Sequence, residues 1–281
     1  MQDFIEAGQP ALDRAYAILA SSSARIPSDQ VDWLAPLPLP AQIPDCLGFE
    51  EHLKNLFESA IKLSAMAAND PVETEHDLRV SGRFAVPEVW YQQPLYYKAN
   101  RFSVAQSGKD IVWPAYSELM DFELEMACII GKKGKDISKC IAPSHIFGYT
   151  IYNDFSARDA QMLETPGMLG PAKNKDFDDS IILGPVIVTA DELDDPYNLR
   201  MQARVNGETW CDSNSNTMHW KFADMIAHIS KSETLYPGEV IGSGTVGLGC
   251  GLEHLRFLNN GDIVELEVEK IGVISNKVIR K

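Results

Sequence analysis

Three carboxylates at alternate positions are the feature of this sequence most able to do chemistry. Asp121, Glu123 and Glu125 lie within residues 118–131, a segment that becomes wholly apolar toward its end. Alternate side chains of a β-strand share one face, so the three carboxylates would face the same way. Burying them together is costly unless positive charge compensates them. Because Mg²⁺ prefers oxygen ligands, the segment indicates a candidate metal site.

A second acidic segment shows that spacing alone does not establish this role. Residues 262–269 alternate in the same way and carry even more acid. An exposed strand face with solvated carboxylates explains either segment as well as a metal does. The pattern therefore leaves the choice between the two segments open.

A polar cluster near the centre of the chain offers further functional groups. The apolar residues 149–152 end in Asn153 and Asp154, and a carboxylate at a strand end is well placed to be a third ligand. Arg158, in the first turn of an expected short helix, could bind a substrate carboxylate through two hydrogen bonds. The alternative is an ordinary helix start with Asp154 or Ser156 as N-cap and a surface arginine.

Two lysines follow in a loop before the next apolar run. Lys173 or Lys175, if it lay beside the three carboxylates, would neutralise charge and could donate to a reacting oxygen. The alternative is that both are ordinary solvated loop lysines.

The elements that must position these residues differ between the two parts of the chain. Residues 9–27 and 50–68 are rich in Ala and Leu at helical spacing, and the proline-rich residues 36–40 predict an extended arm between them. From about residue 94, short apolar or alternating runs separated by Gly, Pro, Asn and Asp predict β-strands. These runs are residues 95–97, 119–131, 148–153, 181–189, 199–210 and 262–274. One helix is expected over residues 219–231.

Composition restricts the partners and the compartment. The chain has 281 residues, 45% of them apolar, and a formal net charge of −15. This balance argues against binding nucleic acid or an anionic membrane, although a pocket can still carry the opposite charge. We find no run long enough for a membrane span and no signal-peptide pattern. Five cysteines without a C-x-x-C pair favour a reducing compartment, so we expect a cytoplasmic protein.

Four motifs follow one another in order along the second part of the chain. They are Asp121-Phe-Glu-Leu-Glu-Met-Ala, Gly148-Tyr-Thr-Ile-Tyr-Asn-Asp-Phe-Ser-Ala-Arg-Asp, Lys175-Asp-Phe-Asp-Asp-Ser-Ile-Ile-Leu-Gly-Pro185 and Pro237-Gly-Glu-Val-Ile-Gly-Ser-Gly-Thr-Val-Gly247. Together they resemble the C-terminal catalytic domain of the fumarylacetoacetate hydrolase (FAH) family, over about residues 90–281. The resemblance favours Glu123 and Glu125 over the second acidic segment.

The resemblance implies a mainly β fold with some α, an FAH-type mixed β-roll or barrel with a small N-terminal α/β region. We expect a helical arm or lid over residues 1–75, a catalytic domain over residues 76–281 and a homodimer. The family's metal ligands fall on Glu123, Glu125 and Asp154, which would hold Mg²⁺, or else Mn²⁺ or Ca²⁺. Its active-site lysine falls on Lys175. Substrate contacts are expected at Arg158, Gln161, Thr245 and Lys98, although Ala99 and Asn100 depart from the proline that usually follows that last lysine.

A weaker match lies nearer the N-terminus. The segment Cys46-Leu-Gly-Phe-Glu-Glu-His52 resembles a family segment in which His52 would be the general base. Hydrolytic members pair this His with a Glu three residues on, but this chain has Asn55 there. We expect Glu51 to orient His52, with Glu50 and Glu58 as alternatives.

The function implied by the resemblance is metal-dependent cleavage of a C–C bond in a small, anionic 2-oxo or β-diketo acid, through a stabilised enolate. A decarboxylase, a dehydratase or hydratase, and an isomerase share that enolate. The departure at Asn55 keeps these alternatives open. A non-catalytic ligand-binding relative is a further alternative, which the intact set of acidic ligands and Lys175 disfavours.

Overall fold

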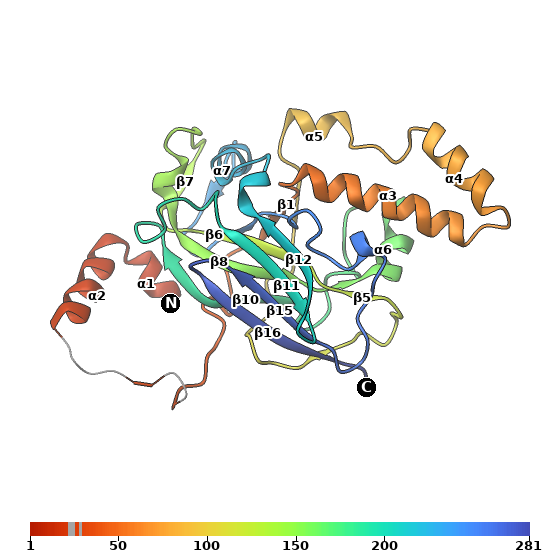
Figure 1. Cartoon of the computed structure of the whole chain (residues 1–281). Coiled ribbons are helices and arrows are strands. Elements are labelled where there is room, and N and C mark those ends of the chain that lie inside the picture. The colour runs from red at the N-terminus through yellow and green to blue at the C-terminus, as the bar shows by residue number, and fades with distance from the viewer. Residues whose placement is uncertain (22–25, 28–29) are drawn as a thin grey trace.

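Two β-sheets and the helices around them form the protein, and the computed structural model describes residues 1–21, 26–27 and 30–281 (Figure 1). The strands of the larger sheet are β1 (Pro44–Cys46), β2 (Tyr96–Lys98), β3 (Val104–Ala105), β6 (Leu124–Ile130), β8 (Ile146–Asp154), β10 (Ile181–Thr189) and β14 (Val240–Gly242). Their order is β2-β1-β14-β6-β8-β10-β3. β1 runs parallel to β14, and β3 runs parallel to β10. The other neighbouring pairs of this sheet are antiparallel.

The smaller sheet lies against the larger one and has the strand order β12-β11-β15-β16-β4. Its strands are β4 (Ile111–Val112), β11 (Arg200–Val205), β12 (Glu208–Asn214), β15 (Ile263–Val268) and β16 (Gly272–Ile279). Two short pairs complete the strands: β5 (Met120–Asp121) with β9 (Ser156–Ala157), and β7 (Gly134–Lys135) with β13 (Thr234–Leu235). Each run predicted as a strand overlaps one, and the expected mixture of β and α elements is confirmed.

The helices are α1 (Gln2–Glu6), α2 (Gln9–Ser21), α3 (Glu50–Met66), α4 (Pro71–Val80), α5 (Glu88–Gln92), α6 (Arg158–Glu164) and α7 (Phe222–Ile229). Those expected over residues 50–68 and 219–231 are present as α3 and α7. The helix expected over residues 9–27 is present as α2, and residues 22–25 of that prediction lie outside the described residues. The sequence patterns did not indicate α4 and α5, which lie between the helical first part of the chain and the β-rich part from about residue 94.

Strand β6 shows how the sequence directs side chains to the two faces of the larger sheet. Leu124, Met126, Cys128 and Ile130 join the main core, which also takes residues from the smaller sheet and from α7. The alternate residues Ala127 and Ile129 belong to a second apolar cluster on the opposite face. Each large apolar side chain buried in this way contributes about 1.5–3 kcal/mol. Glu125, alternating with the core residues, therefore points to the second face.

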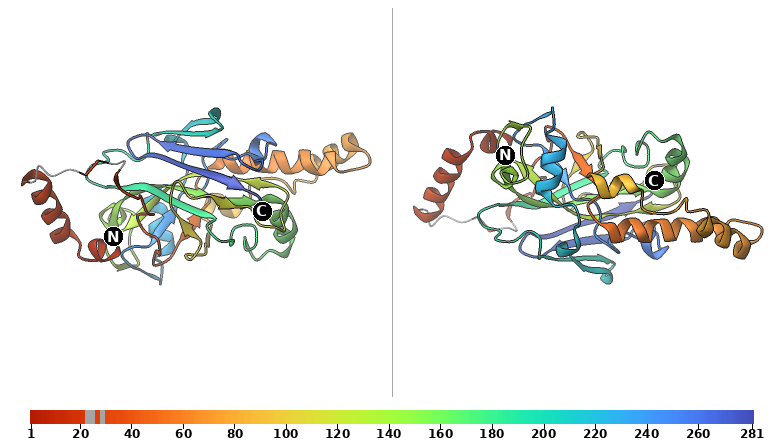
Figure 2. Two further views of the ribbon diagram at one scale, coloured as in Figure 1. Left: turned by 90° about the horizontal axis from the view of Figure 1, so that it is seen from below. Right: turned by 90° about the horizontal axis from the view of Figure 1, so that it is seen from above.

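The N-terminal segment packs onto that second cluster through α1. Ile5 is fully buried there, and Gln2 Nε2 donates to the carbonyl oxygen of Pro237 at 2.8 Å. Figure 2 shows α3 and α4 projecting from the end of the body opposite α1 and α2. Because β1 is already part of the larger sheet, residues 44–46 share a sheet with the expected catalytic domain. The domain boundary at residue 75 stays a prediction.

No helix in the described part of the chain is long and apolar enough to span a bilayer.

A buried carboxyl group at the start of β14 makes the stability of the fold depend on pH. Glu239 is 1% exposed, its Oε1 accepts from the backbone N–H of Tyr236, and its Oε2 has no partner among the described residues. Burial raises the pKa of Glu239 to about 7. Below pH 4 or so the group is protonated in both states. As pH rises through about 7, the stability that this protonation supplies is lost.

We therefore predict that Glu239→Gln raises the melting temperature at about pH 8.5 by at least about 2 °C and changes it little near pH 4.5. Thermal unfolding followed by circular dichroism measures both values. Asp77→Asn, on the exposed surface of α4, is the control. An equal effect of Glu239→Gln at both pH values would contradict this account.

Candidate active site

Three buried carboxylates from separate strands converge on one face of the larger sheet. Asp45 lies on β1, Glu125 on β6 and Asp154 at the end of β8. Carboxylate oxygens of the three residues lie within 4.8 Å of one another. The sequence did not indicate Asp45, because only the pairing of β1 with β14 brings it close to Glu125 and Asp154.

A glycine keeps the space between these carboxylates open. Gly242 on β14 lies between β1 and β6 in the sheet, opposite Asp45 on one side and Ala127 on the other. A Cβ added at Gly242 would lie 2.2 Å from Asp45 Oδ1 and 3.2 Å from Glu125 Oε2. Any side chain at Gly242 would displace these carboxylates.

The cluster carries more negative charge than its surroundings balance. Burial, together with the charge of Asp154, raises the pKa of Asp45 to about 8. Burial followed by the charge of Asp45 raises the pKa of Glu125 well above its usual value, and burial raises that of Asp154 despite Lys175. Asp45 Oδ1 and Asp154 Oδ1 are buried without a hydrogen-bond partner in the described structure. Oxygen ligands with free lone pairs in an acidic setting fit a hard divalent cation.

Glu123, the residue before β6, has a different environment from Glu125. Lys175 Nζ lies 2.6 Å from Glu123 Oε2 and 2.7 Å from Asp154 Oδ2, and Arg158 Nη1 lies 2.8 Å from Glu123 Oε1. Burial alone would raise the pKa of Glu123, but the two cations hold it well below its usual range. Lys175 therefore lies beside the carboxylates, as the resemblance implies.

Arg158 is a buried residue and does not lie at the protein surface. Its Nε lies 2.8 Å from Asp121 Oδ2, and its Nη1 donates to Gln161 Oε1 at 2.9 Å. Asp121 also accepts hydrogen bonds from the backbone N–H groups of Gly251 and Leu252. The guanidinium thus joins Asp121, Glu123 and Gln161, and the alternative of a surface arginine is wrong.

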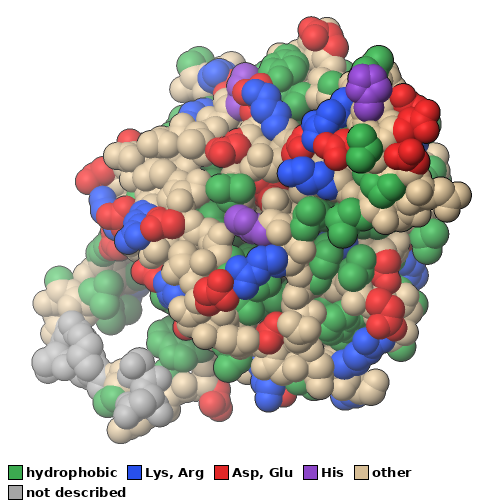
Figure 3. Space-filling model, turned by 45° about the vertical axis from the view of Figure 1, so that its right-hand side comes forward, with side chains coloured by type: hydrophobic (Ala, Val, Ile, Leu, Met, Phe, Trp, Pro, Cys, Tyr) green, Lys and Arg blue, Asp and Glu red, His purple; other side chains and the backbone are tan. Residues whose placement is uncertain are grey.

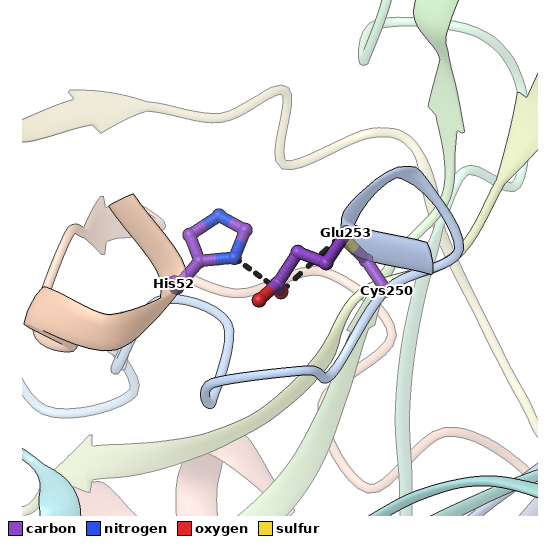
Figure 4. A group of neighbouring side chains, drawn as sticks. All are labelled: His52, Cys250 and Glu253. Carbon is purple, nitrogen blue, oxygen red and sulfur yellow. Dashed lines mark hydrogen bonds and ion pairs between the residues drawn. The ribbon is translucent and has the colours of Figure 1, made fainter. Parts of the chain in front are cut away.

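His52 is paired with a carboxylate far away in the sequence (Figure 4). It lies in the first turn of α3, and its Nδ1 is 2.7 Å from Oε1 of Glu253 in the short helix η5 (Leu252–His254). Asn55 Nδ2 and the backbone N–H of Leu248 donate to Glu253 Oε2, and Cys250 Sγ approaches Oε1 at 3.5 Å. Both oxygens of this buried carboxylate are therefore satisfied, whereas Asp45 and Asp154 each have one oxygen, Oδ1, without a partner in the described structure.

The three carboxylates considered as partners for His52 have other neighbours. Glu50 binds Tyr91 and Lys54, and Glu58 binds Arg79. Glu51 is exposed, with its carboxylate beside Gly247. The hydrogen bond expected from Glu51 is made by Glu253 instead, since the fold brings η5 against α3. No local spacing could have indicated this pair, because 201 residues separate its members.

One cavity of about 350 Å³ connects these groups. His52, Glu123, Glu125, Lys175, Gln161 and Thr245 line it together with Asp45, Leu56, Leu95, Tyr96, Tyr97, Glu164 and Asn174. Tyr97 donates from its hydroxyl to Asp154 Oδ2 at 2.6 Å. Lys98 is not among the residues lining this cavity; it is exposed and lies 2.6 Å from Glu233. Lys98 thus forms a surface ion pair. Exposed Glu51 is not among the lining residues either. Asp154 and Arg158 lie behind the lining and contact it through Lys175 and Glu123, respectively, so the substrate contact expected of Arg158 is not seen directly.

The second acidic segment is separated from this site. Glu265 and Glu267 on β15 are half-exposed and pair with Arg204 at 3.5 and 2.8 Å. Acidic and basic side chains are similarly interspersed over the face drawn in Figure 3. The two acidic segments differ in their burial and in the number of nearby cations. The alternating pattern of acidic and apolar residues reveals neither property.

The fold and these motifs define the class of protein. The Fumarylacetoacetate (FAA) hydrolase C-terminal family matches residues 64–279. The chain therefore belongs to the FAH family of enzymes, whose members commonly use a divalent metal.

Individual relatives cover nearly the whole chain. Oxaloacetate tautomerase Fahd2a, mitochondrial, of Rattus norvegicus is 35% identical over 282 residues, covering 99% of this chain and 79% of the relative. Oxaloacetate tautomerase YisK of Bacillus subtilis is 32% identical over 248 residues, covering 87% of this chain and 72% of the relative. The solved fumarylacetoacetate hydrolase of Exiguobacterium antarcticum is 28% identical, with a TM-score of 0.70, covering 92% of this chain and 82% of that one.

We predict that the carboxylate cluster binds Mn²⁺ and that Asp45→Asn weakens this binding at least about tenfold, because it removes an oxygen ligand. Titration of the metal-free protein, followed by calorimetry, measures the affinity. Glu265→Gln, which neutralises one carboxylate of the second acidic segment, is the matched control.

His52, Cys250 and Glu253 form the other group of candidate ligands in the described chain, within 4.8 Å of one another. If Cys250→Ser reduced Mn²⁺ affinity and Asp45→Asn left it unchanged, the cation would belong to that group and this assignment would be wrong.

Proposed function

We propose that this protein is a divalent-metal-dependent enzyme that interconverts the keto and enol forms of a small 2-oxo acid, with oxaloacetate as the first substrate to test. The observation that carries the proposal is the His52–Glu253 pair, whose histidine lines the same cavity as Asp45 and Glu125 of the carboxylate cluster. Removal of a proton next to a carbonyl needs a base and positive charge at the oxygen. The names of two relatives, both oxaloacetate tautomerases, support the same reaction class.

The carboxylate cluster is the proposed metal site. Asp45, Glu125 and Asp154 would hold the cation. Glu123, just before β6, would be the fourth carboxylate and shares Lys175 with Asp154. When bound, a divalent cation supplies Lewis acidity at the 2-oxo end of the substrate. The ligand set expected from the resemblance is thus kept, with Asp45 added.

His52 is the proposed general base. If Nδ1–H donates to Glu253, the imidazole presents Nε2 as the basic nitrogen, and no described group engages that nitrogen. Nε2 would take a proton from the carbon next to the 2-oxo group and return one there in the reverse direction. Glu253 would orient His52 and stabilise the imidazolium that forms. It would thus take the place expected for Glu51.

The remaining residues stabilise charge and orient the substrate in this proposal. Burial alone would lower the pKa of Lys175, but Asp154 and Glu123 raise it, so the side chain stays cationic. Its positive charge beside the cluster would stabilise the enolate oxygen. Arg158 would hold Glu123 and Gln161 in place, and Thr245, whose hydroxyl lies 3.5 Å from Glu125 Oε1, would line the substrate pocket.

We predict that His52→Asn lowers the rate of hydrogen–deuterium exchange at C3 of oxaloacetate at least about 100-fold in the presence of Mg²⁺. Glu253→Gln should lower it by at least about tenfold, because the imidazole loses its charged partner. Proton NMR in deuterated buffer, corrected for uncatalysed exchange, measures these rates.

Glu51→Gln separates the two assignments of the carboxylate partner. We expect it to change the exchange rate less than about threefold, since Glu51 does not contact His52 in the structure. A larger loss with Glu51→Gln than with Glu253→Gln would contradict the pairing seen here.

C–C bond hydrolysis of an acylpyruvate is the second candidate, because a carboxylate-oriented imidazole can also activate water. Similarity to the solved fumarylacetoacetate hydrolase supports this alternative. Mass spectrometry of the products separates the reactions. Two fragments that together contain one added water indicate hydrolysis, release of CO₂ indicates decarboxylation, and unchanged mass with loss of the enol absorbance indicates tautomerisation.

A further inference from the structure

Three side chains with different donor atoms meet where α3 and η5 come together (Figure 4). His52 Nδ1 lies 2.7 Å from Glu253 Oε1, and Cys250 Sγ lies 3.5 Å from the same oxygen. One ligand atom of each residue lies within 4.8 Å of the other two, and all three side chains are buried. This group offers nitrogen, sulfur and oxygen, whereas the carboxylate cluster offers oxygen alone.

The donor atoms of this group favour Zn²⁺ over Mg²⁺ or Mn²⁺. Thiolate sulfur and imidazole nitrogen are preferred ligands of Zn²⁺, and carboxylate oxygens are those of Mg²⁺ and Mn²⁺. In a tetrahedral zinc site a nitrogen and an oxygen ligand lie about 3.3 Å apart. His52 Nδ1 and Glu253 Oε1 would therefore separate by about 0.6 Å from their present 2.7 Å, a small movement of two side chains.

The hydrogen atoms that now point at Glu253 Oε1 are the ones that Zn²⁺ would replace. The Cys250 thiol would release one proton to solvent, and the His52 imidazole would carry its hydrogen on Nε2 instead of Nδ1. The thiolate and the carboxylate then balance the two positive charges of the ion, so the buried site is neutral. Glu253 Oε2 would keep its hydrogen bonds from Asn55 and Leu248, which hold the carboxylate in place.

We propose that His52, Cys250 and Glu253 form an inhibitory Zn²⁺ site, separate from the carboxylate cluster. His52 lines the cavity, so the ion has a path to the group. With Zn²⁺ on Nδ1, Nε2 carries a hydrogen and cannot accept a proton from the substrate. The enzyme would lose its base while the carboxylate cluster keeps Mg²⁺. The binding of Zn²⁺ is independent of the proposed function, and the inhibition rests on it.

Cys250→Ser tests the binding, because it removes the thiolate and leaves His52 and Glu253 in place. We expect the Mg²⁺-loaded wild type to bind one Zn²⁺ in calorimetry and Cys250→Ser to bind it at least about 100-fold more weakly. Co²⁺, as a spectroscopic probe, should give thiolate-to-metal charge-transfer absorption in the wild type and none in the variant. Cys140→Ser, which removes an exposed cysteine, should keep both properties.

Hydrogen–deuterium exchange at C3 of oxaloacetate tests the inhibition, with excess Mg²⁺ and correction for exchange without enzyme. Saturating Zn²⁺ should lower the wild-type rate at least about 100-fold, as loss of the base would. The same Zn²⁺ concentration should change the rate of Cys250→Ser less than about threefold.

Equal Zn²⁺ affinity in the wild type and Cys250→Ser, or a Co²⁺ spectrum without thiolate absorption, would overturn the site. Zn²⁺ bound at Cys250 with no loss of exchange would overturn its inhibitory role. Cys250→Ala should repeat the loss of affinity, and thermal unfolding checks that both variants fold. If the wild type bound Zn²⁺ through the thiolate but exchanged no hydrogen even without Zn²⁺, the proposed function would be overturned and the zinc site would stand.

Discussion

An excess of buried negative charge organises the centre of this protein. Five buried carboxylates, on Asp45, Asp121, Glu123, Glu125 and Asp154, lie around two buried cations, Arg158 and Lys175, in the described structure. Arg158 pairs with Asp121, both cations pair with Glu123, and Lys175 also pairs with Asp154. Burial nevertheless raises the pKa values of Asp45, Glu125 and Asp154. Protons or a divalent cation must supply the missing positive charge. The charge state of the site would therefore change when a cation binds.

The larger sheet supports this cluster, because its opposite face is apolar and packs into the main core. Alternation along β6 sends Leu124 and Met126 into the main core and Glu125 toward Asp45. Gly242 leaves room between the strands. The proposed base comes from a different part of the fold, since α3 carries His52 and η5 carries Glu253. Strands or strand ends thus carry most of the acidic groups, and α3 with η5 carries the proposed proton-transfer pair.

Much of this could be predicted from the chain itself, and the remainder depends on contacts between distant segments. The apolar run after Glu125 predicted a buried strand, and the spacing of Glu123 and Glu125 placed both on one face. Asp45 has no acidic neighbour at regular spacing, and only the parallel pairing of β1 with β14 brings it to the cluster. Glu253 could not be identified from the sequence either, because only a contact between distant segments brings it to His52. A local rule favoured Glu51 because it is adjacent to His52 in sequence.

The most direct test of the central claim, that the carboxylate cluster holds a divalent cation next to His52, is a crystal structure with Mn²⁺ and oxalate. Anomalous scattering locates Mn²⁺ without reference to any assumed ligand. The account predicts one strong peak among Asp45, Glu125 and Asp154, with oxalate on the side of the cavity that His52 lines. A peak at His52, Cys250 and Glu253, or none in the cavity, would contradict it.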